Sequence, residues 1–477
     1  MEESSALTPL ASEITDIVAS RRKFLEKIQS KIKGTLYILW GSWGSGKSWT
    51  LKQIALLYKK SKRHCGYIDF SNLVNSTDKL HLAVLQQYSQ AIGLVLPEQD
   101  KDIDALAAQI VQNAQTTPTN FLIDNLDCLL RQNEEVFYWM ERVLISPLLA
   151  LAGSQIVATS GIPIQRQWRD YETRRRCQTL HIQPFDRDDL TQLLNLDDAG
   201  IVEYAYQVTA GHPKAIEWYR EIIGMNEINV LNAPEVQRHL WQQEISKRAK
   251  DYFLGKLPQD LAQTASLLSH LRWFNVALLR NLMPDAKAVD DSFYLEKINR
   301  LNRAGLTTWD INRGAYRFTD PAVRLLLSEY ERGKDPQKCA ETHRLSHEYY
   351  AGETRYVEYL SDTLPEVIYH YLWWKTTSGT SLSHAAQSCL DWLRSEPYLE
   401  WRRAESQNWE EVRKVLDGSY FKHADRMQPV VDYAEADSEI ARKYAVEELK
   451  QIMPSDTYSA LLEFLQEYSQ LIQENSQ

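Results

Sequence analysis

A glycine-rich stretch near the start of the chain matches the pattern G-x-x-x-x-G-K-[ST] in full, from Gly41 to Ser48. It follows the apolar run "TLYILW" and precedes the helix-period segment "WTLKQIALLYKK", the setting in which this pattern holds a phosphate chain. Because glycine has no Cβ, Gly41, Gly44 and Gly46 let the loop curl with its N–H groups toward anionic oxygens. The start of the following helix adds partial positive charge. The stretch therefore predicts a phosphate-binding loop.

The side chains beside these glycines supply charge and a metal contact. Lys47 is expected to reach the β- and γ-phosphates of a nucleotide, as a binding and catalytic residue. Ser48 is expected to place its hydroxyl on Mg²⁺. Ser45 in the loop and Trp49 directly after it complete the candidate contacts. The predicted cofactor is a nucleoside triphosphate or diphosphate with Mg²⁺.

A second acidic motif, "FLIDNLDCLL", lies downstream of the glycine-rich loop. Asp124 ends an apolar run and is expected to hold Mg²⁺ through its water shell, which makes it a metal and catalytic candidate. The next residue is Asn125, whose amide cannot act as a base at neutral pH. Asp127 could take that role if the chain curves it toward the γ-phosphate. If it does not, we expect slow hydrolysis, which suits a switch better than a motor.

Polar and basic side chains follow in and after the segment "QIVATSG". Thr159 or Ser160 could sense the γ-phosphate, or could simply make hydrogen bonds at the end of a strand. Ser160 is kept as a candidate nucleotide contact. One of the next arginines could reach a neighbour's nucleotide, although most are expected on a solvated helix face: Arg166, Arg169, Arg174, Arg175 and Arg176.

Short apolar runs alternate with helix-period segments between residues 34 and 185. The strand candidates are "TLYILW", "HCGYIDF", "TNFLIDN" and "SQIVATS", and "TLHIQPF" could be a fifth. This alternation predicts parallel strands joined by crossover helices, and uniformly apolar strands fit a sheet buried on both sides. The predicted fold class is an α/β P-loop NTPase, with a parallel sheet and helices on both faces.

Helical patterns dominate the rest of the chain. Three helical segments followed by "LTTWDINRGAYRFTD", with two short strands around a turn, have winged-helix order. The aromatic-rich helices that come last are expected to bury those side chains or to present them to a partner. The predicted domains are a polar N-terminal tail (1–15), the P-loop domain (16–185), a small helical domain (186–256), a winged-helix domain (257–335) and an all-α C-terminal region (336–477).

Composition excludes several classes of protein. The hydrophobic share of 44% allows a sizeable core, while the formal net charge of −10 argues against a protein that coats nucleic acid. The five cysteines are scattered and form no C-x-x-C pair, which argues against a disulfide framework and a structural zinc site. The acidic, polar start is no signal peptide, and no apolar run is long enough to span a bilayer. We expect a cytoplasmic protein without membrane partners.

Four features resemble STAND NTPases, the signalling branch of the AAA+ superfamily that includes NACHT and apoptotic-type ATPases. "VASRRKFLEKIQ" resembles the segment before the P-loop whose arginine lies against the adenine, which would be Arg21 or Arg22. "IDNLD" resembles the family's Walker B motif. "GHP" at 211–213 is similar to the G-x-P motif, whose proline, here Pro213, packs on base and ribose. "YRFTDPAVRLLL" resembles the winged-helix motif, with Thr319 where the family has a phosphate-contacting His.

The resemblance implies a slow Mg²⁺-dependent ATPase that binds ATP or ADP and acts as a molecular switch. It implies a nucleotide-dependent homo-oligomer, with a trigger or effector protein bound by the C-terminal helices. STAND proteins usually carry an effector domain before the ATPase and a large repeat sensor after it, whereas here we expect only a short segment before the ATPase core and the helical region 336–477 after the winged helix. This reduced form suggests a prokaryotic defence or signalling role with a separate effector.

Two alternatives stay open at the level of sequence. The first is a DNA-acting AAA+ ATPase with its winged helix in the major groove. The third winged-helix segment, "VDDSFYLEKINRLNRAG", mixes acidic and basic residues, and a helix among phosphates normally carries more positive charge. Nucleic acid is therefore the less favoured partner. The second alternative is a scaffold that binds ATP structurally and never changes shape.

Overall fold

The computed structural model describes residues 19–30, 34–72, 79–95, 102–151, 153–195, 198–223, 233–283, 290–353 and 360–394, together with 462 and 464. The chain divides into two compact units, one of Met1–Asn232 with Leu301–Thr307 and one of Ala233–Arg300 with Thr308–Gln477. The predicted N-terminal tail and most of the C-terminal region beyond 394 lie outside the described residues. The predicted boundaries at 185 and 256 stay predictions.

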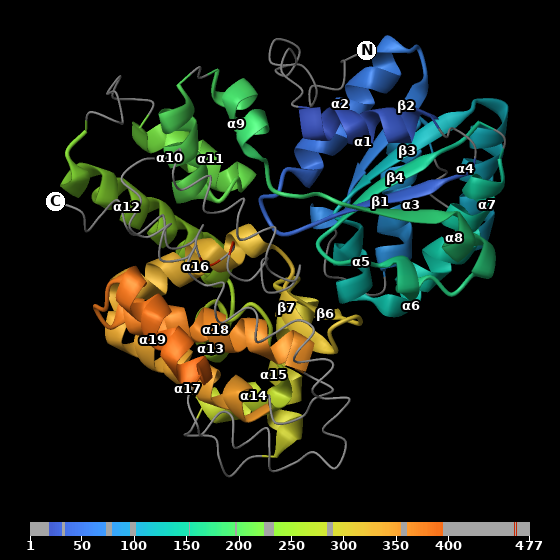
Figure 1. Cartoon of the computed structure of the whole chain (residues 1–477). Helices are drawn as coiled ribbons and strands as arrows, with labels where there is room; N and C mark the ends of the chain where they lie inside the picture. Colours follow the sequence, from blue (N-terminus) through green and yellow to red (C-terminus); the bar gives the residue numbers. More distant parts are fainter. Residues whose placement is uncertain are drawn as a thin grey trace, which may run out of the picture. The chain divides into compact units, whose positions relative to one another are not determined.

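The first unit is built on a five-stranded parallel sheet in the order β2-β3-β4-β1-β5 (Figure 1). The strands are β1 (Leu36–Trp40), β2 (His64–Asp69), β3 (Thr119–Asp124), β4 (Ile156–Ser160) and β5 (Cys177–His181). Every pairing is parallel, so all five carboxyl ends meet at one edge. The predicted parallel sheet is confirmed, and the fifth strand begins at Cys177, two residues before the predicted run.

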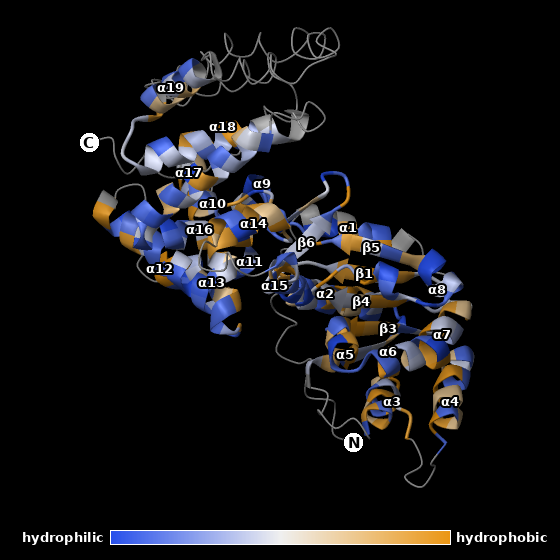
Figure 2. Ribbon diagram, turned by 90° about the horizontal axis from the view of Figure 1, so that it is seen from below, coloured by the Kyte–Doolittle hydropathy of each residue, from blue (hydrophilic) through white to orange (hydrophobic). Residues whose placement is uncertain are grey.

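Helices cover both faces of this sheet because its strands are apolar on both sides. Leu36 and Ile38 join a core with helices on one face, while Tyr37 and Leu39 join a second core on the other. Figure 2 shows hydrophobic colours along the central strands β1 and β3. The helices of this α/β core are α1 (Ala19–Ser30), α2 (Lys47–Lys60), α3 (Leu80–Ala91), α4 (Ile103–Thr116), α5 (Leu126–Gln132), α6 (Glu134–Met140), α7 (Ser146–Ala150) and α8 (Tyr171–Arg176).

Three further helices of the first unit follow the sheet, namely α9 (Arg187–Leu194), α10 (Ala199–Thr209) and α11 (Pro213–Ile223). Asp186 caps α9 and Asp198 caps α10, each by accepting backbone N–H bonds in the first turn. A small core of Phe185, Leu190, Val202 and Ile216 joins them. We call residues 187–223 the α9–α11 segment.

The second unit opens with α12 (Glu235–Leu254), α13 (Gln259–Leu268), α14 (Val276–Leu282) and α15 (Asp291–Arg303), although residues 301–303 at the end of α15 and Thr307 at the start of the next strand are grouped with the first unit. The hairpin strands β6 (Thr307–Asp310) and β7 (Ala315–Phe318) follow, and an antiparallel bridge joins Phe274 to Tyr316. Four helices come next: α16 (Pro321–Lys334), α17 (Pro336–Glu353), α18 (Leu360–Thr377) and α19 (Leu382–Arg394). Within the described ranges, no helix combines the length and apolar character that crossing a bilayer requires.

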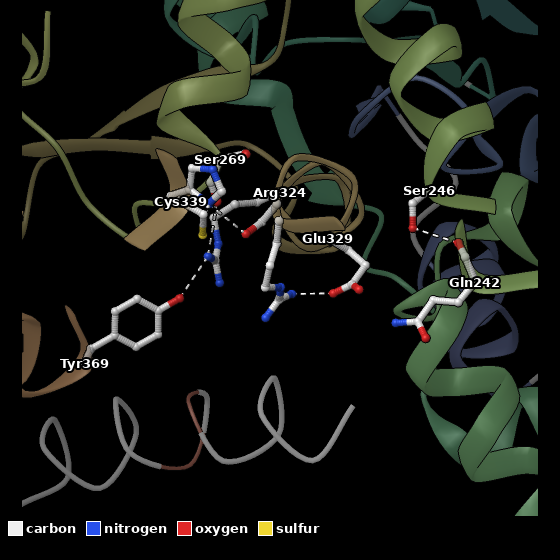
Figure 3. Close-up of polar contacts among 10 residues, drawn as sticks. Gln242, Ser246, Ser269, Arg324, Glu329, Cys339 and Tyr369 are labelled. Carbon is white, nitrogen blue, oxygen red and sulfur yellow. Dashed lines mark hydrogen bonds and ion pairs between the residues drawn. The ribbon is translucent and has the colours of Figure 1, made fainter. Parts of the chain in front are cut away.

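Buried polar groups lie inside the helical part of the second unit. Arg324 Nη1 donates to the hydroxyl of Tyr369 at 3.2 Å and lies 3.5 Å from the carbonyl oxygen of Ser269 (Figure 3). Arg332 forms an ion pair with Glu329. The arginines are thus partnered inside the fold, so their charge is compensated by hydrogen bonds and an acidic neighbour.

Candidate nucleotide-binding site

The glycine-rich loop joins the carboxyl end of β1 to the amino end of α2, as predicted. Gly46 stands at the N-cap with φ 86, and α2 begins at Lys47 and runs for 14 residues. The first-turn N–H groups and the positive end of the dipole of this helix therefore face the loop. The Ser45 hydroxyl is buried and has no hydrogen-bond partner among the described residues. This arrangement suits a phosphate group, which accepts several N–H and O–H bonds at once.

Lys47 folds back over the loop that precedes it. Its Nζ donates to the carbonyl oxygens of Gly41 at 2.9 Å and Ser42 at 2.7 Å, and the residue is 9% exposed. The ammonium group is therefore held at the mouth of the loop, where a phosphate oxygen could replace a carbonyl. Ser48 is half-buried beside it, whereas Trp49 is 36% exposed on the first turn of α2.

Asp124 ends β3 with its carboxylate inside a small hydrogen-bond network. Tyr67 donates to its Oδ2 at 2.8 Å, and Thr159 donates to its Oδ1. Burial, and then the negative charge of Asp124, raise the pKa of the Tyr67 hydroxyl, which therefore stays a donor. Asp124 and Ser48 each offer hard oxygen donors of the kind that Mg²⁺ prefers, and their joint role as metal ligands stays a prediction.

The structure separates the two γ-phosphate candidates on β4. The Thr159 hydroxyl bonds Asp124 and accepts from the backbone N–H of Asn125 at 2.8 Å. Ser160 is occupied locally, because its hydroxyl donates to the carbonyl of Ile162 at 2.6 Å and accepts from the N–H of the same residue at 3.1 Å. Thr159, rather than the candidate Ser160, therefore belongs to the acidic network.

Asp127, the predicted base, lies in α5 with its carboxylate engaged. Its Oδ2 is 2.7 Å from Nη2 of Arg131, one helical turn further along. A different acid, missed at the level of sequence, lies beside Asp124. Asp69 ends β2 as the register partner of Asp124, and its Oδ1 accepts a 2.9 Å bond from Nδ2 of Asn125. The sequence feature that could have pointed to Asp69 is its position at the end of the strand candidate "CGYID", which parallels the position of Asp124 at the end of "FLID".

The two arginines before the loop have different environments. Arg21 is 1% exposed, and its Nη2 lies 2.8 Å from the carbonyl of Gln183 and 3.5 Å from that of Ser45. Its guanidinium also lies 4.6 Å from the ring centroid of Phe185. Arg22, one residue on, is exposed. The structure thus brings Arg21 to the loop.

The G-H-P stretch at 211–213 packs directly on the phosphate loop. The Ser42 hydroxyl is 3.3 Å from Nε2 of His212. A Cβ added to Gly44 would lie 2.8 Å from Cβ of Lys214, and one added to Gly46 would lie 3.9 Å from Cγ of Pro213. Glycine at 44 is therefore what lets α11 approach so closely. Pro213, predicted to touch the nucleotide, stands beside the loop.

The remaining candidates lie elsewhere. Three arginines of α8 are partnered on their own side: Arg174 bonds the carbonyl of Trp168, while Arg175 and Arg176 pair with Glu172. They precede β5, so they lie at the sheet edge opposite the phosphate loop. Thr319 belongs to the second unit, buried just before α16. Its contact with a nucleotide stays a prediction.

No family model matches the chain, and no curated protein matches it. Among solved structures it is similar to the Walker-type ATPase PABY2304 of Pyrococcus abyssi, with 14% identity, TM-score 0.47, and coverage of 65% of this chain and 95% of that one. The ORC2 protein of Aeropyrum pernix in ADPNP–ADP complexes gives 14% identity, TM-score 0.40, and 66% and 92% coverage. The ORC1 protein of Aeropyrum pernix with DNA gives 15% identity, TM-score 0.36, and 68% and 95% coverage. At such low identity the function must be inferred from the site's own residues.

Proposed function

We propose that this chain is a Mg²⁺-dependent ATPase with slow turnover, in which the bound nucleotide controls how the α9–α11 segment sits on the phosphate loop. The observation that carries the proposal is the direct packing of His212, Pro213 and Lys214 on the glycine-rich loop. A phosphate chain entering the loop has to share space with this segment. Its position therefore depends on which nucleotide is bound, as a switch requires.

The residues of the site divide the work of binding. The loop N–H groups and the start of α2 hold the phosphates, and Lys47 moves its ammonium from the loop carbonyls to phosphate oxygens. Ser48 and Asp124 would hold Mg²⁺, which when bound neutralises charge on the phosphate oxygens. Arg21 and Pro213 would contact the base and ribose side, as the STAND resemblance implies. The preference for adenine rests on that resemblance.

The first test compares nucleotide binding and turnover in the wild-type chain and Lys47→Ala. Loss of charge-assisted hydrogen bonds should weaken ATP binding by about tenfold to a hundredfold. Lys60→Ala, at the exposed end of the same helix, is the matched control and should leave binding unchanged. Wild-type turnover far below roughly 1 s⁻¹ that rises with protein concentration supports a switch that hydrolyses when assembled. Unchanged ATP affinity in Lys47→Ala would overturn the site assignment.

A second candidate function is a DNA-acting ATPase. The observation that favours it is the order α13, α14, α15, β6, β7 with the bridge between Phe274 and Tyr316, which would suit a winged helix. In that fold the third helix, here α15, can enter the major groove. Binding to duplex DNA at low salt, and a steep fall in affinity as salt rises, would support this function over a protein-directed switch.

The charges of α15 favour a protein partner instead. Lys297 and Arg300 lie 3.2 Å and 3.3 Å from the same carboxylate oxygen of Asp260, so both cations already have an acidic neighbour. Phe293 and Leu295 on the same helix are 36% and 40% exposed. Such a surface suits a protein better than a phosphate backbone. Only the motif resemblance supports the STAND subtype, the defence setting, the separate effector and the homo-oligomer.

A further inference from the structure

The carboxyl ends of β2 and β3 bring two acids together at the phosphate loop's edge of the sheet (Figure 1). Asp69 and Asp124 are direct register partners in this parallel pair. Register partners on neighbouring strands point to the same face of a sheet, so the two carboxylates lie side by side. Asp69 is therefore a neighbour of the predicted magnesium ligand, although the two are far apart in the sequence.

The carboxylate of Asp69 is held in one orientation by three donors. Its Oδ1 accepts from Nδ2 of Asn125 and from the backbone N–H of Ser71, each at 2.9 Å. Its Oδ2 accepts from the Ser71 hydroxyl at 2.9 Å. A carboxylate offers about four acceptor sites, so one remains for a further donor such as water. The group is half-buried, which leaves it open to solvent on one side.

Asn125 is placed to hold that carboxylate. Its backbone is left-handed, with φ 57 and ψ 43, a conformation that Asn adopts more readily than most residues. This backbone lets its N–H bond Thr159 and Asp124 while its side-chain amide turns to Asp69. The residue after the magnesium ligand thus contributes the amide, and the neighbouring strand contributes the acid.

We propose that Asp69 is the catalytic base of ATP hydrolysis and that Asn125 is its positioning residue. This rests on the proposed ATPase function. The water oxygen forms a bond to the γ-phosphorus while the bond from that phosphorus to the β–γ bridging oxygen breaks. The electron pair of the broken bond stays on that bridging oxygen, which leaves as part of ADP. The water proton passes to the Asp69 carboxylate and later returns to solvent.

The alternative base, Asp127, is bound differently. Its carboxylate is 7% exposed and its Oδ2 lies 2.7 Å from Nη2 of Arg131, so this oxygen is already engaged by a neighbouring side chain. Asp69 has amide and hydroxyl donors in the described structure and no cation paired with it there, and its half-buried carboxylate keeps an acceptor site open to a water molecule. The two assignments of the base therefore predict opposite results for the isosteric variants Asp69→Asn and Asp127→Asn.

The experiment measures single-turnover ATP hydrolysis and, separately, the Kd for ATP in Asp69→Asn and Asp127→Asn. Asp69→Asn should hydrolyse ATP about a hundredfold more slowly, the usual contribution of a general base, with Kd within about twofold of wild type. Asp127→Asn should keep most of its rate. A wild-type rate in Asp69→Asn, or loss confined to Asp127→Asn, overturns the proposal. Loss of ATP binding in Asp69→Asn also overturns it, since a purely catalytic group should not set affinity.

A reciprocal exchange guards against misfolding as the explanation. Asp69→Asn with Asn125→Asp in one chain keeps one amide and one carboxylate at the same hydrogen bond. The double variant should hydrolyse ATP at least about tenfold faster than Asp69→Asn alone. Asn125→Ala, which frees the carboxylate without removing it, should lower kcat and leave Kd unchanged. If the wild-type chain binds ATP but never hydrolyses it, this inference fails while a nucleotide-controlled switch stands.

Discussion

The hydroxyl of Ser42 in the phosphate loop lies 3.3 Å from Nε2 of His212, at the turn before α11. Both residues are buried, at 4% and 0% exposed, so water does not compete for the contact. The two positions are 170 residues apart in the chain. The contact links the loop that receives the phosphates to the α9–α11 segment.

His212→Ala should uncouple the α9–α11 segment from the phosphate loop. Losing one buried neutral hydrogen bond costs about 1 kcal/mol, so ADP affinity should fall by about fivefold. Limited proteolysis should no longer give different patterns with ADP and with a non-hydrolysable ATP analogue. The exposed His64 serves as control, and His64→Ala should leave both readouts unchanged. Retained nucleotide-dependent patterns in His212→Ala would contradict this coupling.

Gly211 should tolerate no side chain. It has φ +69, and an added Cβ would collide with the carbonyl oxygen of Phe185. Left-handed backbone costs a non-glycine residue about 1 kcal/mol, and the collision adds to that, so Gly211→Ala should lose about 3 kcal/mol of unfolding free energy. Denaturant unfolding monitored by tryptophan fluorescence measures the loss.

Gly93 provides a matched control for that substitution. It has nearly the same backbone, φ +70, but nothing lies within 4 Å of an added Cβ. Gly93→Ala should therefore cost only the backbone strain of about 1 kcal/mol. Equal losses in the two variants would mean that strain alone, and not the packing of Gly211 on Phe185, governs the position.

Thr159→Val and Ser160→Ala should differ although the residues are adjacent. Removing the Thr159 hydroxyl takes one donor from Oδ1 of Asp124 and one acceptor from the N–H of Asn125, so the bond between these two groups at 3.1 Å is left to hold this oxygen. The Mg²⁺ concentration for half-maximal hydrolysis should then rise about tenfold, since a displaced carboxylate binds the cation less well. The Ser160 hydroxyl bonds the backbone of Ile162 in the described contacts, so Ser160→Ala should keep the wild-type Mg²⁺ dependence. The reverse order would point to Ser160 as the sensor.

Local pattern was sufficient to predict the elements that carry the site. The loop "GSWGSGKS", the apolar runs of β1 to β4 and the acid at the end of β3 each depend on neighbouring residues only. The same holds for both faces of the sheet, because Leu36 and Ile38 alternate with Tyr37 and Leu39 along one strand. These features need no knowledge of the tertiary fold.

Choices between adjacent residues could not be made from the sequence. Arg21 rather than Arg22 meets the loop because the phase of α1 against the sheet decides which side chain is buried. Asp69 could not be identified from the sequence, because it becomes a site residue only by lying next to the end of β3, and the order of strands in a sheet is a tertiary property. Asp127 was chosen for its nearness to Asp124 in sequence, yet the helical spacing of α5 places it against Arg131.

Acid should destabilise the second unit through buried neutral histidines. Burial, and then the charges of Arg332, Arg324 and Lys338, lower the pKa of His270 to about 3. Burial also lowers the pKa of His343 and His370, whose Nδ1 atoms are 2.8 Å apart. Since an unfolded histidine titrates near 6.5, the unfolded state binds more protons below that pH. The free energy of unfolding should therefore be independent of these histidines above about pH 7.5. It should fall progressively from pH 6.5 downward, by about 2 kcal/mol per buried histidine at pH 5.

The measurement is the urea midpoint of the whole chain at pH 7.5, 6.0 and 5.0. His270→Gln should flatten the fall between pH 6.5 and 5.0, whereas His384→Gln, on the exposed start of α19, should not. His270, Cys339 and His343 also offer ligand atoms within 4.8 Å of one another. The positive charges of Arg324 and Arg332 act on His270 and disfavour a divalent ion there, so EDTA should leave the pH dependence unchanged. A midpoint that does not change between pH 7.5 and 5.0 would contradict buried, neutral histidines, because each must take up a proton when the chain unfolds.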